Sequence, residues 1–257
     1  MNIDEQQREA LYQACLPLFQ ALLIKEKLAN ELLPLLSGVY LQLAAWVAAK
    51  HKNKPVVIGI NGAQGSGKST LAKILHLLLS QLFNKSVLEL SIDDLYLPRN
   101  ERQQLADTVH PLLAVRGVPG THDVKLANKI VKKIFKSDLD IKIPVFNKAH
   151  DDLLSEDEWR NIKAPVDLVL FEGWCVGASA QSEDELVQPI NSLEINEDPD
   201  GVWRQYVNQQ LKGPYKSLFS NIDYMIMLKV PDMTCVFERR SLQEKNWLTA
   251  AKKIINQ

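Results

Sequence analysis

Short apolar runs alternate with longer amphipathic segments from Pro55 onward. The apolar runs predict buried strands at 56–60, 86–92, 166–171 and 224–230. Apolar positions spaced by three and four residues predict helices at 69–82, 124–135 and 203–219. We expect Gly213 and Pro214 to break the last of these helices. Strands that alternate with helices predict a three-layer α/β sandwich with a mostly parallel sheet.

The region that precedes the first predicted strand, residues 4–50, also predicts helix. Its apolar residues recur at steps of three and four from Leu11 to Leu22, which gives one apolar stripe. Pro17 and Pro34 interrupt the pattern, so we expect two or three helices. We interpret them as a helical extension that packs on the rest of the chain rather than as a regulatory element.

Length and composition favour one large domain, because 257 residues with 46% hydrophobic content bury a substantial core. We assign residues 1–52 to the helical extension and residues 53–257 to the core of that domain. Two acidic segments, 183–185 and 194–200, predict solvated loops.

Charge and cysteine content narrow the class of protein. A net charge of −1 gives no overall basic surplus, so we expect neither nucleic acid nor an anionic membrane as a partner. Cys15, Cys175 and Cys235 lie far apart, which indicates reduced thiols rather than disulfides or a zinc site. The polar N-terminus does not resemble a signal peptide, and the apolar stretch at 39–49 is too short to span a bilayer. We therefore expect a cytoplasmic protein.

A glycine-rich segment follows the first predicted strand. GAQGSGKST at 62–70 satisfies the phosphate-binding pattern G-x-x-x-x-G-K-[ST], and a predicted helix follows it. The residues predicted to bind nucleotide are Gly62, Ala63, Gln64, Gly65, Ser66, Gly67, Lys68, Ser69 and Thr70. The glycines let backbone N–H groups surround phosphate oxygens, and the positive end of the helix dipole favours the same charge. Lys68 is suited to the β- and γ-phosphates and Ser69 to Mg²⁺, whereas Thr70 supports the first turn. The segment predicts binding of ATP with Mg²⁺.

Two further predicted strands end on carboxylates. Asp93 and Asp94 follow the second strand, and Glu172 follows the third. In a parallel sheet these strand ends lie beside the phosphate-binding loop. We assign Asp93 as the general base for a nucleophile and Glu172 as a group that holds Mg²⁺, and we expect Asp94 to cap the turn or support its neighbours.

With these residues in place, the chain resembles the D-glycerate 3-kinase family and its uncharacterised bacterial kinase relatives, within the wider group of uridine and pantothenate kinases. The resemblance runs from about Pro55 to Leu248. Its landmarks are GAQGSGKST (62–70), SIDDLYL (91–97), HPLLAVRGVPGTHD (110–123), IPVFNKAHDD (143–152), LVLFEGWCVG (168–177) and YKSLFSNID (215–223).

The resemblance implies roles for residues in these segments. It places Asp93 as the acid that deprotonates the acceptor hydroxyl and Glu172 in the Mg²⁺ environment. The remaining residues implied to approach the acceptor are Tyr96, Arg116, His122 and Asp123. It also implies a lid near 232–248, where Arg239 and Arg240 close over the transferring phosphate.

Two departures from the family pattern affect what we expect. Phe146-Asn147 stands where the family often has an aromatic residue followed by Asp, so an acidic contact from Asn147 is lost and the acceptor is left open. The family usually continues past the lid to a last parallel strand, whereas this chain ends at Gln257. Without that strand, one sheet edge and part of the nucleotide pocket are expected to be incomplete.

The sequence thus predicts an ATP- and Mg²⁺-dependent kinase that acts on a hydroxyl of a small molecule, with D-glycerate or a related hydroxy acid as the expected acceptor. One alternative is another acceptor on the same scaffold, such as pantothenate or a nucleoside. A second is an ATPase or nucleotide-dependent switch that acts on a protein partner, although a GTPase is disfavoured because an NKxD motif is missing. A third is a catalytically weak relative with an incomplete C-terminus. The oligomeric state is left open.

Overall fold

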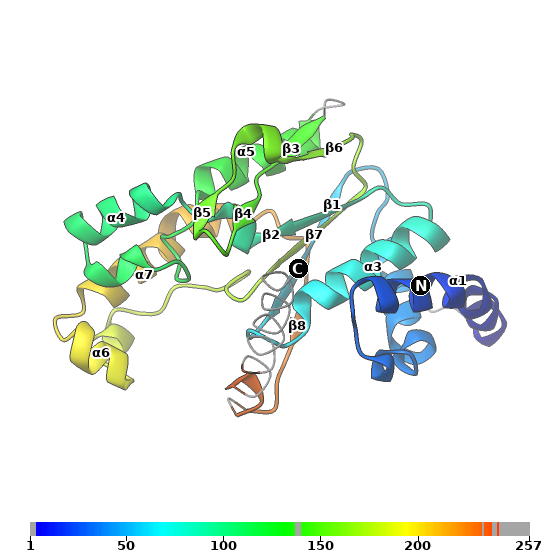
Figure 1. Ribbon diagram of the computed structural model, residues 1–257, viewed down its shortest axis with the longest axis horizontal. Coiled ribbons are helices and arrows are strands. Elements are labelled where there is room, and N and C mark those ends of the chain that lie inside the picture. The colour runs from blue at the N-terminus through cyan, green and yellow to red at the C-terminus, as the bar shows by residue number, and fades with distance from the viewer. Residues whose placement is uncertain (1–3, 137–139, 233, 238–240, 242–257) are drawn as a thin grey trace, which may run out of the picture.

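The computed structural model describes residues 4–136, 140–232, 234–237 and 241. Within these ranges the strands and helices follow the expected alternation (Figure 1). The strands are β1 (Val56–Gly62), β2 (Val87–Ser91), β3 (Ile141–Ile143), β4 (Phe146–Asn147), β5 (Asp152–Leu153), β6 (Arg160–Ile162), β7 (Leu168–Gly173) and β8 (Tyr224–Leu228). The α-helices are α1 (Glu5–Lys25), α2 (Leu41–Ala48), α3 (Lys68–Leu82), α4 (Arg99–Thr108), α5 (Val124–Lys136), α6 (Ser192–Glu197), α7 (Val202–Gln210) and α8 (Lys216–Phe219).

The central sheet has the strand order β2-β7-β1-β8, and every neighbouring pair is parallel. The register aligns Ile60 of β1 with Glu172 of β7, and Glu172 with Ser91 of β2. The carboxyl ends of these strands therefore meet at one edge, beside the start of α3. The small pairs β3–β6 and β4–β5 are antiparallel and lie outside this sheet.

Alternate side chains of the strands enter two apolar cores, because successive residues of a strand point to opposite faces. Ile58 and Leu170 join one core with α1, α2 and α3. Val57 and Val169 join the other core with α5 and the helical segment that ends at α8. The result is the three-layer α/β sandwich with a parallel sheet that the sequence predicts, as Figure 1 shows with α1 and α3 on one side of the sheet and α5 on the other.

The expectation that Pro17 interrupts the first helix is wrong, because α1 runs through it from Glu5 to Lys25. Pro17 lies on the exposed face, so the carbonyl that loses its N–H partner is accessible to solvent. Burial of Phe19 and Leu23 on the other face, and a capping box between Asp4 and Gln7, stabilise the continuous helix.

The expectation that Gly213 and Pro214 break the helix is also wrong. The chain stays helical and passes from α7 to α8 through a π-helical turn, Leu211–Tyr215. A wider turn accommodates the missing N–H of Pro214 without unwinding the helix. Tyr215 of this turn is fully buried, and its hydroxyl reaches the loop before α5.

The acidic segments at 183–185 and 194–200 are not simply solvated loops. Glu194 lies in α6, and its carboxylate accepts hydrogen bonds from the backbone N–H of Ile190 and the side chain of Asn191. Asp198 is 1% exposed and pairs with the guanidinium of Arg204 at 3.1 Å. These two carboxylates are buried because polar partners satisfy them.

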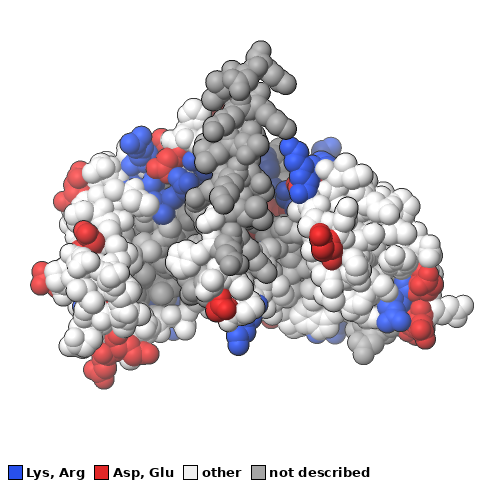
Figure 2. Space-filling model, turned by 60° about the horizontal axis from the view of Figure 1, so that its bottom comes forward, with Lys and Arg blue, Asp and Glu red and all other residues white. Residues whose placement is uncertain are grey.

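The charged side chains on one face of the molecule do not form a large patch of one sign. On the face shown in Figure 2, Lys, Arg, Asp and Glu side chains form small separate groups of both signs on an otherwise uncharged surface. Among the described residues, no helix combines the length and apolar character that crossing a membrane requires.

Candidate active site

The loop between β1 and α3 has the backbone that a phosphate cradle requires. Gly65 and Gly67 adopt φ angles of +73° and +97°, which a side chain would strain. A Cβ on Gly62 would lie 2.6 Å from Ser66 Oγ and 2.9 Å from the Leu228 carbonyl oxygen. The loop can therefore curl tightly before α3 begins at Lys68, with the positive end of the helix dipole at its N-terminus.

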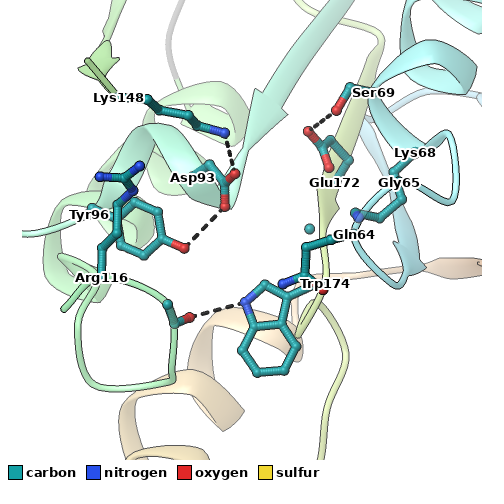
Figure 3. A pocket seen from close by; sticks show the side chains of 12 residues that line it. Gln64, Gly65, Lys68, Ser69, Asp93, Tyr96, Arg116, Lys148, Glu172 and Trp174 are labelled. Carbon is teal, nitrogen blue, oxygen red and sulfur yellow. Dashed lines mark hydrogen bonds and ion pairs between the residues drawn. The ribbon is translucent and has the colours of Figure 1, made fainter. Parts of the chain in front are cut away.

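Lys68 and Ser69, at the start of α3, point into the space in front of this loop (Figure 3). The Lys68 amine donates a hydrogen bond to the carbonyl oxygen of Ala63 at 3.0 Å, which folds it back over the loop. Its burial lowers the pKa of Lys68, although the nearby carboxylates of Glu172 and Asp93 favour the charged form. A partly desolvated amine interacts strongly with a phosphate, because little water screens the charge.

Glu172, at the end of β7, accepts hydrogen bonds from two hydroxyl groups on neighbouring elements. Ser69 Oγ lies 2.9 Å and Ser91 Oγ 3.0 Å from its Oε1 atom. Glu172 is 8% exposed, and this burial raises the pKa of its carboxyl group despite the two hydrogen bonds. The parallel register of β2, β7 and β1 brings the three groups together, as the strand-end argument predicts.

The oxygen atoms of Ser69 and Glu172 fit a site for Mg²⁺. Hard oxygen ligands suit this ion, which commonly takes one or two protein ligands and completes its shell with water and substrate phosphates. Within the described ranges, no group of three or more His, Cys, Asp and Glu side chains forms a metal site of its own. The arrangement suits a metal that arrives with a nucleotide.

Asp93 faces this region from the turn that follows β2. Tyr96 donates a hydrogen bond from its hydroxyl to Asp93 Oδ1 at 3.3 Å, and the Lys148 amine lies 2.6 Å from Asp93 Oδ2. Burial opposes ionisation of Asp93, but the charge and hydrogen bond of Lys148 outweigh it and hold the pKa of Asp93 below its usual value. Asp93 is therefore an ionised carboxylate, able to accept a hydrogen bond from a hydroxyl group.

Arg116 supplies a cation beside Asp93. Its guanidinium pairs with the carboxylate of Asp151 and lies over the ring of Phe146, with 5.6 Å from Cζ to the ring centroid. The next residue, Gly117, accepts a hydrogen bond through its carbonyl oxygen from the indole N–H of Trp174 at 3.0 Å. These contacts fix the loop that carries Arg116.

A cavity of about 330 Å³ lies between the phosphate-binding loop and the residues around Asp93. The residues that line it are Gln64, Gly65, Lys68, Ser69, Asp93, Tyr96, Arg116, Gly117, Lys148, Glu172, Gly173 and Trp174. In Figure 3 the phosphate-binding loop and Glu172 lie on one side, and Asp93, Tyr96, Arg116 and Lys148 lie on the other. Groups suited to a phosphate donor therefore face groups suited to a hydroxyl acceptor.

No family model matches the sequence, but curated proteins that resemble the chain are named as kinases. The chain is 34% identical over 204 residues to the uncharacterized kinase mug58 of Schizosaccharomyces pombe, covering 76% of this chain and 72% of the relative. The chain belongs to the P-loop kinase family that includes D-glycerate 3-kinase. It is 30% identical over 195 residues to the chloroplastic D-glycerate 3-kinase of Arabidopsis thaliana, covering 72% of this chain but 40% of that protein.

A solved structure of a family member supports the same assignment. The D-glycerate 3-kinase of Cryptococcus neoformans has 26% sequence identity and a TM-score of 0.69 over 83% of this chain and 80% of that one. As a member of this kinase family, the chain is a small-molecule kinase.

Two residues implied by the resemblance do not line the kinase cavity. His122 is 5% exposed, and its Nδ1 atom lies 2.6 Å from the Tyr215 hydroxyl, while its ring stacks on Tyr96 with centroids 4.3 Å apart. Asp123 Oδ1 accepts a hydrogen bond from the backbone N–H of Leu126 at 2.8 Å, in the first turn of α5. Both support the wall behind Tyr96. Arg239 and Arg240, predicted for the lid, lie outside the described residues.

Sequence reasoning did not single out Lys148 and Trp174, which also line the cavity of this kinase. Both lie in segments that carry the family resemblance, so the segments were found but these side chains were not. Asn147, where an acidic residue was expected, accepts hydrogen bonds from the backbone N–H groups of Ala149 and His150 and shapes the turn between β4 and β5. That turn presents Lys148 to Asp93.

Proposed function

We propose that the chain transfers the γ-phosphoryl group of ATP to a hydroxyl of D-glycerate or a related hydroxy acid. The proposal rests chiefly on one observation: Lys68 and Ser69 of the phosphate-binding loop share a single cavity with Asp93 and Arg116. A donor phosphate and an acceptor hydroxyl can therefore meet within one cavity. Transfer requires such proximity, because positioning supplies much of the rate of phosphoryl transfer.

The nucleotide side of the cavity neutralises phosphate charge. Backbone N–H groups of the loop and the Lys68 amine suit the β- and γ-phosphates of ATP. Ser69 and Glu172 would hold Mg²⁺, which supplies charge neutralisation between those phosphates when bound. Arg239 and Arg240 enter the proposal through the family resemblance, as further cations for the transferring group.

The acceptor side of the cavity positions and deprotonates the hydroxyl. The Asp93 carboxylate accepts its proton as the hydroxyl oxygen forms a bond to the γ-phosphorus. The bond from that phosphorus to the bridging oxygen breaks, and ADP leaves with the electron pair. Arg116 is suited to a carboxylate of the acceptor, because its planar guanidinium can donate two parallel hydrogen bonds.

A coupled ADP-release assay with product detection by mass spectrometry tests the proposal. The panel contains D-glycerate, other small hydroxy acids, pantothenate and uridine, with a reaction that lacks any acceptor. We expect release of ADP that depends on D-glycerate or another hydroxy acid, with phosphorylated acceptor formed in equal amount. Equal release without acceptor would indicate an ATPase or switch, and turnover of pantothenate or uridine alone would show that the proposed acceptor is wrong.

A further inference from the structure

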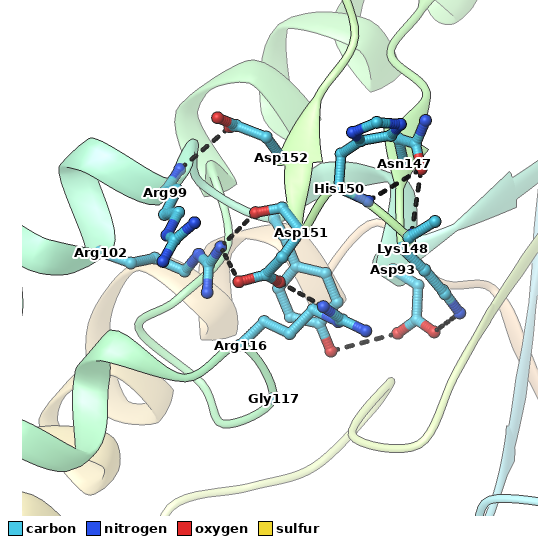
Figure 4. Close-up of polar contacts among 12 residues, drawn as sticks. Asp93, Arg99, Arg102, Arg116, Gly117, Asn147, Lys148, His150, Asp151 and Asp152 are labelled. Carbon is cyan, nitrogen blue, oxygen red and sulfur yellow. Dashed lines mark hydrogen bonds and ion pairs between the residues drawn. The ribbon is translucent and has the colours of Figure 1, made fainter.

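The hairpin formed by β4 and β5 supplies an oppositely charged partner to two residues of the acceptor side (Figure 4). Lys148 in its turn lies 2.6 Å from Asp93, and Asp151 pairs with Arg116. Asp93 and Arg116 are the groups proposed to receive the hydroxyl and the carboxylate of the acceptor. In the free protein, both are therefore already engaged by the hairpin.

The ion pair between Arg116 and Asp151 is stabilised by a third residue, Arg102, which binds Asp151. Arg102 of α4 is fully buried, and its guanidinium donates to the carbonyl oxygen of Asp151 at 2.7 Å and to Asp151 Oδ2 at 2.9 Å. Its other N–H groups reach the carbonyl oxygens of Leu97 and Ala114. Movement of Asp151 would leave a buried cation poorly paired, which is costly. The Arg116–Asp151 pair is thus expected to persist when an acceptor binds.

In the ion pair between Asp93 and Lys148, the lysine is restrained much less than Arg102 is. The side chain of Lys148 is 59% exposed, compared with 0% for Arg102. A lysine that is mostly in water can change partner readily, because its flexible stem allows several positions and water solvates its ammonium group between partners. Of the two ion pairs, Arg116–Asp151 and Lys148–Asp93, we therefore expect the second to break when an acceptor binds.

The ion pairs that join the hairpin to the acceptor side contain one more cation than carboxylate. Three cations, Arg102, Arg116 and Lys148, are joined to two carboxylates, Asp93 and Asp151. One positive charge is therefore not balanced within the group. An acceptor that carries a single carboxylate balances it, whereas an uncharged polyol does not.

We propose that Lys148 determines specificity for an anionic acceptor by changing partner, from Asp93 in the free protein to the acceptor's carboxylate, which it then shares with Arg116, in the complex. The exchange frees Asp93 for the acceptor hydroxyl only when an anionic group is present to take Lys148. An uncharged alcohol leaves Lys148 on Asp93, so its hydroxyl has to compete with an ammonium group for the carboxylate. This inference rests on the proposed function and deepens it.

Lys148→Met tests the inference, with D-glycerate and glycerol as the two probe acceptors at saturating Mg·ATP. Methionine keeps most of the stem and removes the charge. We expect kcat/KM for D-glycerate to fall about 10- to 100-fold, because a charge-assisted hydrogen bond is lost. We expect kcat/KM for glycerol to stay within about threefold or to rise, because the ammonium no longer competes for Asp93. Lys148→Arg should restore most of the preference for D-glycerate.

Lys142→Met is the matched control, because Lys142 is an exposed lysine of β3 whose amine contacts the Glu156 carbonyl oxygen away from the cavity. This variant should leave kcat/KM unchanged for both D-glycerate and glycerol. Equal losses for D-glycerate and glycerol in Lys148→Met, or no loss for either, would overturn the inference while the proposed function stands. Failure of the proposed function is seen instead in the wild-type protein. If the wild type phosphorylates pantothenate instead, the ratio of kcat/KM for pantothenate to kcat/KM for its alcohol, compared between the wild type and Lys148→Met, decides the role of Lys148. If the wild type uses only uncharged acceptors, or none, the inference is also wrong.

Discussion

The indole N–H of Trp174 donates a hydrogen bond to the carbonyl oxygen of Gly117 at 3.0 Å. Trp174 follows Glu172 by two residues at the end of β7, and Gly117 follows Arg116. The bond therefore joins the strand that carries the proposed Mg²⁺ ligand to the loop that carries the proposed carboxylate anchor. It is a direct link between the two halves of the cavity.

Trp174→Phe should weaken acceptor binding and leave ATP binding nearly unchanged. Phenylalanine retains an aromatic ring but cannot donate to Gly117, so the Arg116 loop loses one restraint. One neutral hydrogen bond contributes about 0.5–1.5 kcal/mol, which corresponds to a rise in the acceptor's KM of about 2- to 10-fold. Steady-state kinetics with each substrate varied in turn measures this. Trp159→Phe is the matched control, since it removes a similar bond to the Leu154 carbonyl oxygen outside the cavity lining. An equal rise in both variants would contradict the link.

Lys68→Met should abolish most phosphoryl transfer without destabilising the fold. The amine is partly desolvated, and the hydrogen bond that it donates in the structure goes to the Ala63 carbonyl oxygen within the same loop. Loss of one cation from a preorganised site is expected to lower kcat by about 10²-fold or more. ADP release and thermal unfolding, compared with Lys129→Met on the exposed face of α5, separate the two effects. If Lys68→Met turned over at the rate of the parent protein, Lys68 would not have the proposed role of neutralising the phosphates.

Arg102→Met should destabilise the protein and weaken acceptor binding together. The substitution leaves the carbonyl oxygens of Leu97 and Ala114 without a donor and releases Asp151 from its anchor. We expect a loss of about 2–4 kcal/mol in the free energy of unfolding, measured in urea. Arg99→Met replaces an exposed arginine on the same helix and should change it by no more than about 0.5 kcal/mol. Similar values for the two variants would show that the buried guanidinium is not a structural anchor.

Acid should destabilise the protein partly through His122. Burial lowers the pKa of its imidazole to about 3, whereas an unfolded histidine titrates near 6.5. The unfolded chain therefore binds more protons between these values, and the stability that neutral His122 contributes above about pH 6.5 is lost progressively as the pH falls toward about 3. His122→Phe keeps a ring against Tyr96 and removes this titration. Urea unfolding from about pH 7 to about pH 4 should show a shallower loss in the variant. A constant difference between the two proteins at every pH would be inconsistent with the neutral buried imidazole.

The sequence predicted the central sheet because its strands are coded locally. Each of β1, β2, β7 and β8 consists mainly of apolar residues, and the phosphate-binding loop has a fixed spacing of glycines. The helix α4 was not predicted, because its segment Arg99–Thr108 is mostly polar and its anchor, Arg102, looks like any surface arginine until the fold buries it. Pro17 misled the helix prediction because an isolated pattern does not reveal which face of α1 is exposed.

The acceptor side was harder to predict than the nucleotide side for a related reason. The strands β4 and β5 are two residues long, too short for a periodic pattern to appear. The contacts of Asp93 with Lys148 and of Arg102 with Asp151 span 55 and 49 residues. Such pairs arise from the turn of a hairpin and the packing of a helix, and no local signal specifies them.

The most direct test of the account is the effect of Asp93→Asn on phosphoryl transfer to D-glycerate, with ATP affinity and thermal stability measured on the same preparation. Asparagine keeps the shape but cannot accept a proton, so we predict that kcat falls about 10²–10⁴-fold while the Kd for Mg·ATP changes little. Asp94→Asn is the matched control, because the neighbouring carboxylate pairs with Arg160 at 3.5 Å and does not line the main cavity. It should keep kcat within a few-fold of the parent. An Asp93→Asn protein that is less stable yet turns over D-glycerate at the parent rate would contradict the account.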